Sequence, residues 1–256
     1  MKNWKYVKES LIINYKTWIA LTISSYFICD YKLLTGIYSY IIGLLYIYFG
    51  HIYYHSPLST TYYYIHSYHH DHTDKNSILF EVIMEFAGTM MPIIIGYCLF
   101  KWKNIVLGFN PYVYLFFALF YSTVHIINYT YLRCNNMHMD HHLNTAGNYF
   151  PDICDLIFNT KHNPSDVENT DHWIPNIIII TLVVLLFKNI YRKSDNKKLL
   201  NILGFIVYGL LYDAIIIFSI YYYIKDLLYN DNLNKKHFEN NISFIKNKIN
   251  NTRMRY

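Results

Sequence analysis

The chain has 256 residues and a formal net charge of +5; 54% of its residues are hydrophobic and only 15% are charged. Soluble domains usually carry about a quarter charged residues, so this composition indicates a membrane protein. The basic residues are scattered at the N-terminus, over 188–198 and in the C-terminal tail. That pattern is typical of charge flanking a membrane and argues against a nucleic-acid surface.

Four apolar segments come first along the chain, each close to the roughly 20 residues that a spanning helix needs. They cover residues 11–29, 33–50, 78–100 and 105–127. The first two predict a helical hairpin that turns at Asp30-Tyr31-Lys32. The pattern predicts an all-α fold, an integral-membrane helical bundle with four or more spans.

Two further apolar stretches follow. Residues 174–187 are about 14 in number, which favours a re-entrant or interfacial segment over a span. Residues 199–224 are long enough to cross the membrane, although Asp213 lies among them. The Asn- and Lys-rich tail after Tyr229 is predicted to be a solvated end.

Polar segments at 51–77 and 128–175 separate these apolar pairs and hold eleven of the thirteen histidines. Both segments lie on one side of the membrane if each preceding pair is a hairpin. Three N-terminal lysines place that side in the cytosol by the positive-inside rule. Lys101 and Lys103, in the turn on the other side, argue against this orientation.

Three histidine clusters stand out in the polar segments, with the spacings H-x3-H, H-x2-H-H and H-x2-H-H. On a helix, residues three and four apart share a face, so each cluster is predicted to offer its imidazoles to one point. The clusters are His51 and His55; His66, His69 and His70; and His138, His141 and His142.

Imidazole is a ligand for iron, zinc and copper, and eight of them are too many for one four-coordinate zinc ion. The sequence therefore predicts a two-metal site, with His125 as a ninth candidate ligand. His72 is a weaker candidate. His162, His172 and His237 are single histidines, which are more often ordinary surface or core residues.

These motifs resemble the fatty acid hydroxylase and sterol desaturase superfamily of membrane di-iron oxygenases. The resemblance covers residues 33–160 and includes NYFPDICDLIFNT, Asn148 to Thr160, which is similar to the family's Asn-Tyr-Gly and Asp-x-x-Phe-Gly-Thr segments. The chain departs from the family at Phe150 and Asn159, which stand where glycines are usual. Around His125, the expected second histidine of an H-x3-H pair is missing.

The resemblance implies a membrane domain over 1–163, with its core at 33–160. The additional apolar helices and polar tail expected over 164–256 have no counterpart in the family. The resemblance also implies two iron ions as cofactors, with zinc as an alternative occupant of a purified sample. The nine candidate ligands would then hold the irons. The helices that carry them would cap the site on the cytosolic side.

The activity implied is hydroxylation of a fatty acyl or sterol C–H bond with O2. The implied partners are a lipid substrate, the bilayer, and an external electron donor such as cytochrome b5 with its reductase; nucleic acid is not expected. A eukaryotic source would place the protein in the endoplasmic reticulum. Metal-ligating histidines usually donate their other N–H to an orienting partner, and the candidates here are Asp155, Asn148 and Asp140. Asp155 could equally be a helix cap.

Three alternatives stay open. A desaturase would use the same di-iron centre. A membrane metal transporter would place ionisable groups near the middle of the bilayer, where this chain offers Glu81, Glu85 and Asp213. A degenerate family member with a structural role would account for the missing histidine and glycines.

Overall fold

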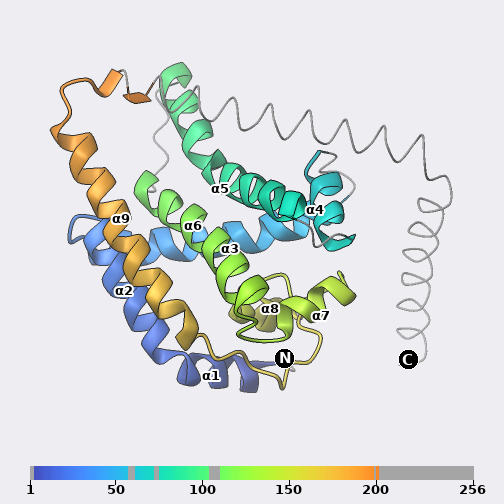
Figure 1. Ribbon diagram of the computed structural model, residues 1–256. Helices are drawn as coiled ribbons and strands as arrows, with labels where there is room; N and C mark the ends of the chain where they lie inside the picture. Colours follow the sequence, from blue (N-terminus) through green and yellow to red (C-terminus); the bar gives the residue numbers. More distant parts are fainter. Residues whose placement is uncertain (1–2, 57–60, 72–74, 104–109, 199, 202–256) are drawn as a thin grey trace, which may run out of the picture.

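The structure is a computed structural model that describes residues 3–56, 61–71, 75–103, 110–198 and 200–201. These residues form helices and connecting loops, without a strand, which confirms the all-α prediction (Figure 1). Four helices are long and apolar enough to cross a membrane: Leu33–Tyr54, Ser77–Lys103, Pro111–Tyr131 and Asp171–Lys193. The apolar stretch 199–224 and the tail beyond it lie outside the described residues, apart from 200–201.

The first predicted span is divided into two helices, α1 (Trp4–Ile13) and α2 (Tyr15–Ile28). Asn14 separates them, because its carboxamide bonds outside the helix, donating 2.8 Å to the carbonyl of Glu168 and accepting 2.8 Å from the N–H of Thr170. Asn residues that find such partners favour helix breaks. With only 14 residues, α2 is too short to span by itself, so the expectation of a single span over 11–29 was wrong.

The predicted hairpin between the first helices is confirmed. α2 packs against α3 (Leu33–Tyr54), and the turn between them places Asp30 and Tyr31 at positive φ angles of 55° and 63°. The close approach of these two helices depends on Gly36 of α3, where an added Cβ would lie 2.8 Å from Oγ of Ser25 in α2.

The histidine-bearing helix α4 (Thr61–Asp71) precedes the long helix α5 (Lys75–Lys103). α6 (Pro111–Thr123) begins with Asn110 as its N-cap and Pro111 in the first turn, the usual sequence for a helix start. It continues without a break as the π-helix η2 (Val124–Tyr131). This wider turn carries His125 into the bundle.

Short helices α7 (Met137–Leu143) and α8 (Asp152–Phe158) follow, and the one-turn η3 (Asp171–Trp173) leads into α9 (Ile174–Lys193). With its 20 residues, α9 is longer than the 14-residue apolar stretch suggested. It is apolar enough to cross a membrane, so the prediction of a segment too short to span was wrong. The apolar stretch ends before Lys188, but the helix continues through the basic residues to Lys193.

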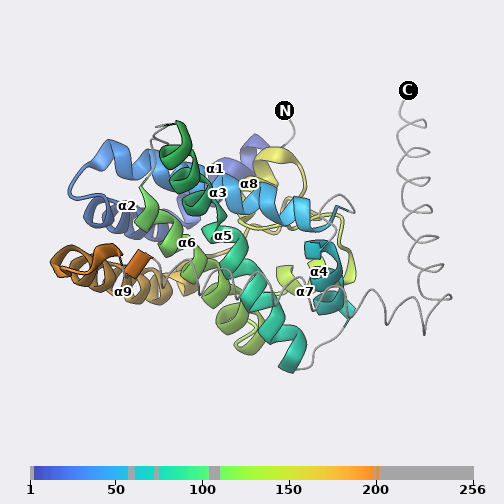
Figure 2. The same ribbon diagram turned by 90° about the horizontal axis from the view of Figure 1, so that it is seen from above.

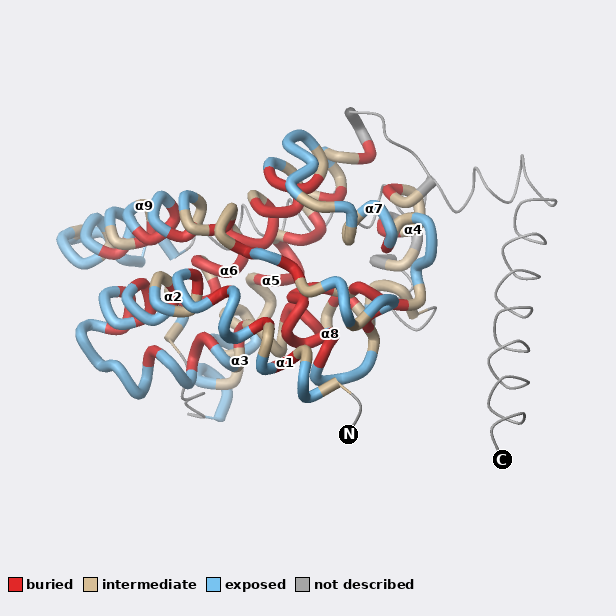
Figure 3. The backbone as a smooth tube through the Cα atoms, turned by 90° about the horizontal axis from the view of Figure 1, so that it is seen from below, coloured by how far each residue is buried: buried red, intermediate tan, exposed pale blue. Residues whose placement is uncertain are grey.

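α6 lies at the centre of the bundle, in contact with α3, α5 and α9, while α2 packs on α3 and α9 (Figures 1 and 2). Its Phe116, Phe117 and Phe120 are fully buried. In contrast, α9 exposes large apolar side chains such as Leu182 and Ile179 (Figure 3). A helix with an apolar exposed face suits contact with lipid.

The two ends of the bundle differ in composition. The end of α3, α4, the start of α5, η2 and α7 meet at one end and bring the histidines together, as the hairpin argument predicted. At the other end, Lys188 and Arg192 of α9 bind the carboxylate of Asp30 at 2.7 Å and 2.6 Å. The N-terminal lysines flank the histidine end, and Lys188 and Arg192 flank the other. The positive-inside rule therefore does not decide which end faces the cytosol.

Candidate metal centre

Four histidines from three helices form the first group, here called tetrad 1: His51, His55, His66 and His141. His51 lies on the last turn of α3 and His55 just after it, whereas α4 contributes His66 and α7 contributes His141. The Nε2 atom of His55 lies 2.9 Å from that of His66 and 3.0 Å from that of His141. Those of His51 and His66 are 3.2 Å apart.

A second group, tetrad 2, lies beside the first and contains His69, His125, His138 and His142. The Nε2 atom of His138 lies 2.7 Å from that of His125 and 2.9 Å from that of His142. His69 completes the group from α4; its ring centroid is 4.8 Å from that of His142. Neither of its ring nitrogens has a hydrogen-bond partner in the described part of the chain.

Each H-x2-H-H cluster is divided between the two tetrads, so the expectation that a cluster serves one point was wrong. His66 belongs to tetrad 1 and His69 to tetrad 2. Residues three and four further along a helix lie on opposite sides of the first residue, which sends neighbouring rings to different points. His70 lies between the tetrads, 3.1 Å from His66 by Nε2 and 4.3 Å from His142 by ring centroid.

Two backbone carbonyls orient histidines of tetrad 1. His51 donates its Nδ1–H to the carbonyl of Tyr149, and His141 donates 2.7 Å to that of Gly147. A carbonyl oxygen only accepts, so in both rings Nδ1 carries the proton and Nε2 keeps its lone pair. Metal-bound histidines in proteins are usually held in this way.

Two glutamates of α5 do the same for one histidine of each tetrad. His66 donates from Nδ1 to Oε1 of Glu81 at 2.8 Å, and His125 donates from Nδ1 to Glu85. Both carboxylates are almost fully buried, with exposed fractions of 2% and 1%. Sequence reasoning missed these two orienting groups, although buried acids one turn apart in an apolar helix are a recognised signal of function.

The Nε2 lone pairs of His51 and His66 therefore face one another at 3.2 Å with no proton between them. Such an arrangement is repulsive unless a cation lies among the nitrogens. For metal–nitrogen bonds of about 2.1 Å, neighbouring ligands lie about 3.0 Å apart around a six-coordinate ion and about 3.4 Å apart around a tetrahedral one. The closest pairs, at 2.7–3.2 Å, and the limit of 4.8 Å within each tetrad are compatible with ligands of a single ion. A six-coordinate ion held by four histidines would keep positions open for other ligands.

Burial keeps the imidazoles neutral and ready to bind. It lowers the pKa of His141 to about 4 and that of His142 to about 2, and neighbouring histidines contribute to the lowering. The pKa of His138 is lowered well below its usual value by burial first and by His125 second. Because only neutral imidazole binds a metal, this environment favours metal over protons.

A third acid-containing group, formed by Glu81, Glu85 and His125, has the size of a metal site. It shares His125 with tetrad 2. A neutral imidazole has one lone pair, and the Nδ1–H of His125 is already directed at Glu85. The two carboxylates therefore suit the role of orienting groups and not that of a third ion site.

The expected orienting residues differ in their placement. Asp155 is fully buried, but it contacts no histidine; its carboxylate accepts from the N–H groups of Tyr149 and Phe150 at 2.9 Å and 2.8 Å and so fixes the segment whose carbonyl binds His51. Asn148 bonds to His162 and to the Met137 carbonyl. Asp140 is exposed, and its carboxylate makes no hydrogen bond to a histidine of the described chain.

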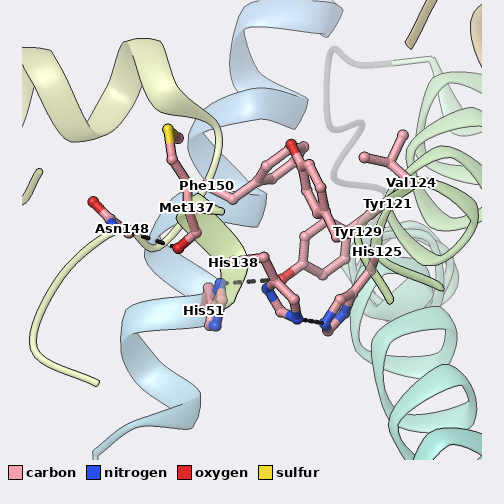
Figure 4. A pocket seen from close by; sticks show the side chains of 9 residues that line it. All are labelled: His51, Tyr121, Val124, His125, Tyr129, Met137, His138, Asn148 and Phe150. Atoms are coloured by element: carbon pink, nitrogen blue, oxygen red, sulfur yellow. Dashed lines mark hydrogen bonds between the residues drawn. The ribbon is translucent and has the colours of Figure 1, made fainter. Parts of the chain in front are cut away.

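A small cavity opens beside both tetrads (Figure 4). The cavity has a volume of about 20 Å³. It can hold one or two waters and is too small for an acyl chain. His51, His125 and His138 point into it, together with aromatic rings. The complete lining is His51, Tyr121, Val124, His125, Tyr129, Met137, His138, Asn148 and Phe150.

Tyr121 and Tyr129 lie four residues before and after His125, where the resemblance leads one to expect a histidine. Both contact histidines of the centre. The hydroxyl of Tyr121 lies 3.1 Å from Nδ1 of His51. Tyr129 stacks on His138, with ring planes 19° apart. Neither adds a ring nitrogen, so His125 enters tetrad 2 as the one histidine of η2.

Of the nine sequence candidates, eight fall into the two tetrads and His70 lies between them. His72 and His237 lie outside the described residues. His162 contacts Asn148, and His172 contacts Asn128; neither belongs to a tetrad.

The chain thus contains four helices able to cross a membrane and, at one end, two adjoining groups of buried or half-buried histidines that could bind metal. No protein-family model, curated protein or solved structure matches it. The centre is therefore interpreted from its own geometry.

Proposed function

We propose that this protein is a membrane oxidoreductase whose two histidine tetrads hold two iron ions and which uses O2 to hydroxylate a lipid C–H bond. The observation that carries the proposal is the pair of adjoining tetrads. Fixed Nδ1–H groups leave the Nε2 lone pairs of three histidines free in tetrad 1 and that of His125 free in tetrad 2. Two ions with open positions suit dioxygen chemistry, and imidazole is a common ligand of iron.

In this proposal, the bound irons supply the redox chemistry that amino-acid side chains lack. The residues of the chain do the rest. Tyr149, Gly147 and the α5 glutamates orient the imidazoles, and aromatic rings line the small cavity beside them. Electrons would come from a separate protein such as cytochrome b5, at a cytosolic face of the endoplasmic reticulum if the source is eukaryotic.

A lipid substrate is supported by the position of the centre. The tetrads lie at the ends of apolar helices; α3, for example, contributes His51 from its last turn and is followed at once by His55. A fatty acyl or sterol group in the bilayer would therefore approach the site from the same layer in which these helices lie. Lipid desaturation with the same centre is the close alternative, which product analysis separates.

Metal transport fits the geometry less well. Glu81 and Glu85 lie in the first third of the span Ser77–Lys103, where each accepts a hydrogen bond from a histidine, and not at the middle of the span. A transporter would take up metal into vesicles without consuming O2.

The proposal is tested by lipid analysis of membranes that contain the full-length chain, its His69→Ala variant or neither. A hydroxylated lipid found only with the intact chain supports the proposal, and a new double bond supports the desaturase. Purified protein should also contain two ions per chain, by elemental analysis. Unchanged lipids together with metal-free protein would contradict the proposal.

A further inference from the structure

Glu81 and Glu85 are one helical turn apart on α5, and each binds a histidine of a different tetrad. Glu81 accepts from His66 of tetrad 1, and Glu85 accepts from His125 of tetrad 2. Residues four apart on a helix lie on the same face. A single face of α5 therefore reaches both tetrads.

The second oxygen of each carboxylate has no partner. Oε2 of Glu81 and Oε2 of Glu85 are buried and form no hydrogen bond within the described chain. Among the described residues, no lysine or arginine lies within ion-pair distance of either carboxylate, and the ion-pair partner of each is a histidine. Burying two ionised carboxylates in an apolar helix bundle is strongly unfavourable, so they need either a proton or a positive charge nearby.

A positive charge that compensates the two carboxylates could lie at the centre of each tetrad. Each glutamate contacts Nδ1 of an imidazole whose Nε2 faces the centre of a tetrad. A cation bound at Nε2 would polarise the ring, strengthen its N–H donor and face the carboxylate across the imidazole. Carboxylate–histidine–metal arrangements of this kind raise the basicity of the ligand and fix its orientation.

We infer that Glu81 and Glu85 are positioning residues, one for each ion, which supply a buried countercharge to tetrad 1 and tetrad 2 respectively. This inference rests on the proposed two-ion centre. It assigns the two acids to different ions, whereas their closeness in sequence would suggest one shared site. Loss of such a partner typically weakens metal binding 10- to 100-fold.

Cobalt(II) is a suitable probe, because its visible absorption reports bound ions without any catalysis. Full-length protein in detergent is titrated in two backgrounds. His142→Ala disables tetrad 2 and leaves tetrad 1 to bind, whereas His55→Ala does the reverse. Glu81→Gln and Glu85→Gln are then added singly to each background.

In the His142→Ala background, Glu81→Gln is expected to weaken cobalt binding 10- to 100-fold, and Glu85→Gln to leave it unchanged. In the His55→Ala background the two effects exchange. Asp166→Asn, an exposed carboxylate-to-amide change at the same end of the bundle, is the matched control and should alter neither titration. The visible spectrum of the remaining ion should shift only with the glutamate assigned to it.

Equal effects of both glutamates in both backgrounds, or no effect of either, would overturn the inference. Glu81→Asp and Glu85→Asp provide a second pair if a glutamine variant does not fold; they keep the charge but shorten the side chain, and the same selective pattern is expected. Wild-type protein that binds no cobalt would contradict the proposed function itself. Two bound ions without the selective pattern would contradict only the role of the glutamates.

Discussion

The hydroxyl group of Tyr129 donates a hydrogen bond of 2.6 Å to the buried carboxylate of Glu168. The same tyrosine ring stacks on His138 of tetrad 2. Glu168 also accepts from the side chain of Asn135. The segment that follows α8 is thereby connected to the metal centre through one aromatic ring.

Tyr129→Phe removes this donor while keeping the ring. Hydrogen bonds to charged groups contribute about 1.5–3 kcal/mol, so we expect a decrease of that size in the free energy of unfolding, measured in detergent. Metal content should not change, because phenylalanine retains the stacking on His138. Tyr131→Phe, at an exposed position of the same helix, is the control. Equal stability of the two variants would show that the bond to Glu168 does not contribute.

Gly147→Ala should disturb tetrad 1 through the backbone. An added Cβ would lie 2.3 Å from the carbonyl oxygen of Thr160, so the segment must shift, and with it the carbonyl that accepts from His141. Overpacking of this kind destabilises by about 1–3 kcal/mol. We expect lower thermal stability and a loss of metal from tetrad 1, measured by elemental analysis.

Gly50→Ala is the matched control for this substitution. Gly50 is next to His51 in sequence, but a Cβ there meets no atom within 4 Å. Alanine favours the helix by about 1 kcal/mol over glycine, so this variant should be at least as stable as the wild type. A loss of metal in both variants would point to a general sensitivity of the bundle and not to the carbonyl of Gly147.

Asp30→Asn should act in a pH-dependent way. The pKa of the Asp30 carboxyl is lowered in the folded protein, first by the hydrogen bond from Arg192. A carboxyl with a lowered pKa stabilises the fold above its unfolded value of about 3.9, and this contribution is lost as the pH falls through the folded value. The variant should therefore melt below the wild type at pH 7, and the difference should shrink as the pH falls below about 3.9. A constant difference across this range would contradict the ion pair.

If α9 crosses the membrane, the two ends of this helix lie on opposite sides of the bilayer. Cysteine reporters can be introduced as Asp166→Cys and Asn196→Cys, both at exposed positions, in a chain from which the exposed Cys98 and Cys134 are removed. In sealed vesicles, a membrane-impermeant maleimide should label one reporter and spare the other. Labelling of both from the same side would show that α9 does not cross. The labelled end also fixes the side of the histidines.

The sequence predicted the fold class and the joining of the histidines because both follow from local rules. Apolar length predicts spanning helices, and hairpin topology brings residues 51–70 and 138–142 to the same end. The length of α9 was underestimated, since Lys188 looked like a boundary. In the structure its amine binds the carbonyl of Ile28 and the carboxylate of Asp30, so the charge is accommodated inside the bundle.

The partition of the histidines could not be predicted in this way. Whether His69 and His70 face one ion or two depends on the rotation of α4 about its axis, which its packing on α5 sets and which no spacing specifies. The carbonyl groups that accept hydrogen bonds from His51 and His141 could not be predicted for another reason. The carbonyls of Gly147 and Tyr149 are backbone groups, and side-chain patterns do not reveal them.

Asn14 binds Glu168 and Thr170, residues that follow it by 154 and 156 positions. During synthesis, the first two helices therefore leave the ribosome long before their partners exist, and their polar groups must stay hydrated or temporarily paired until residue 170 has emerged. Contacts between such distant residues form late in folding. The segment that carries Glu168 would then join Tyr129, and through its ring His138, only after all eight tetrad histidines have been made.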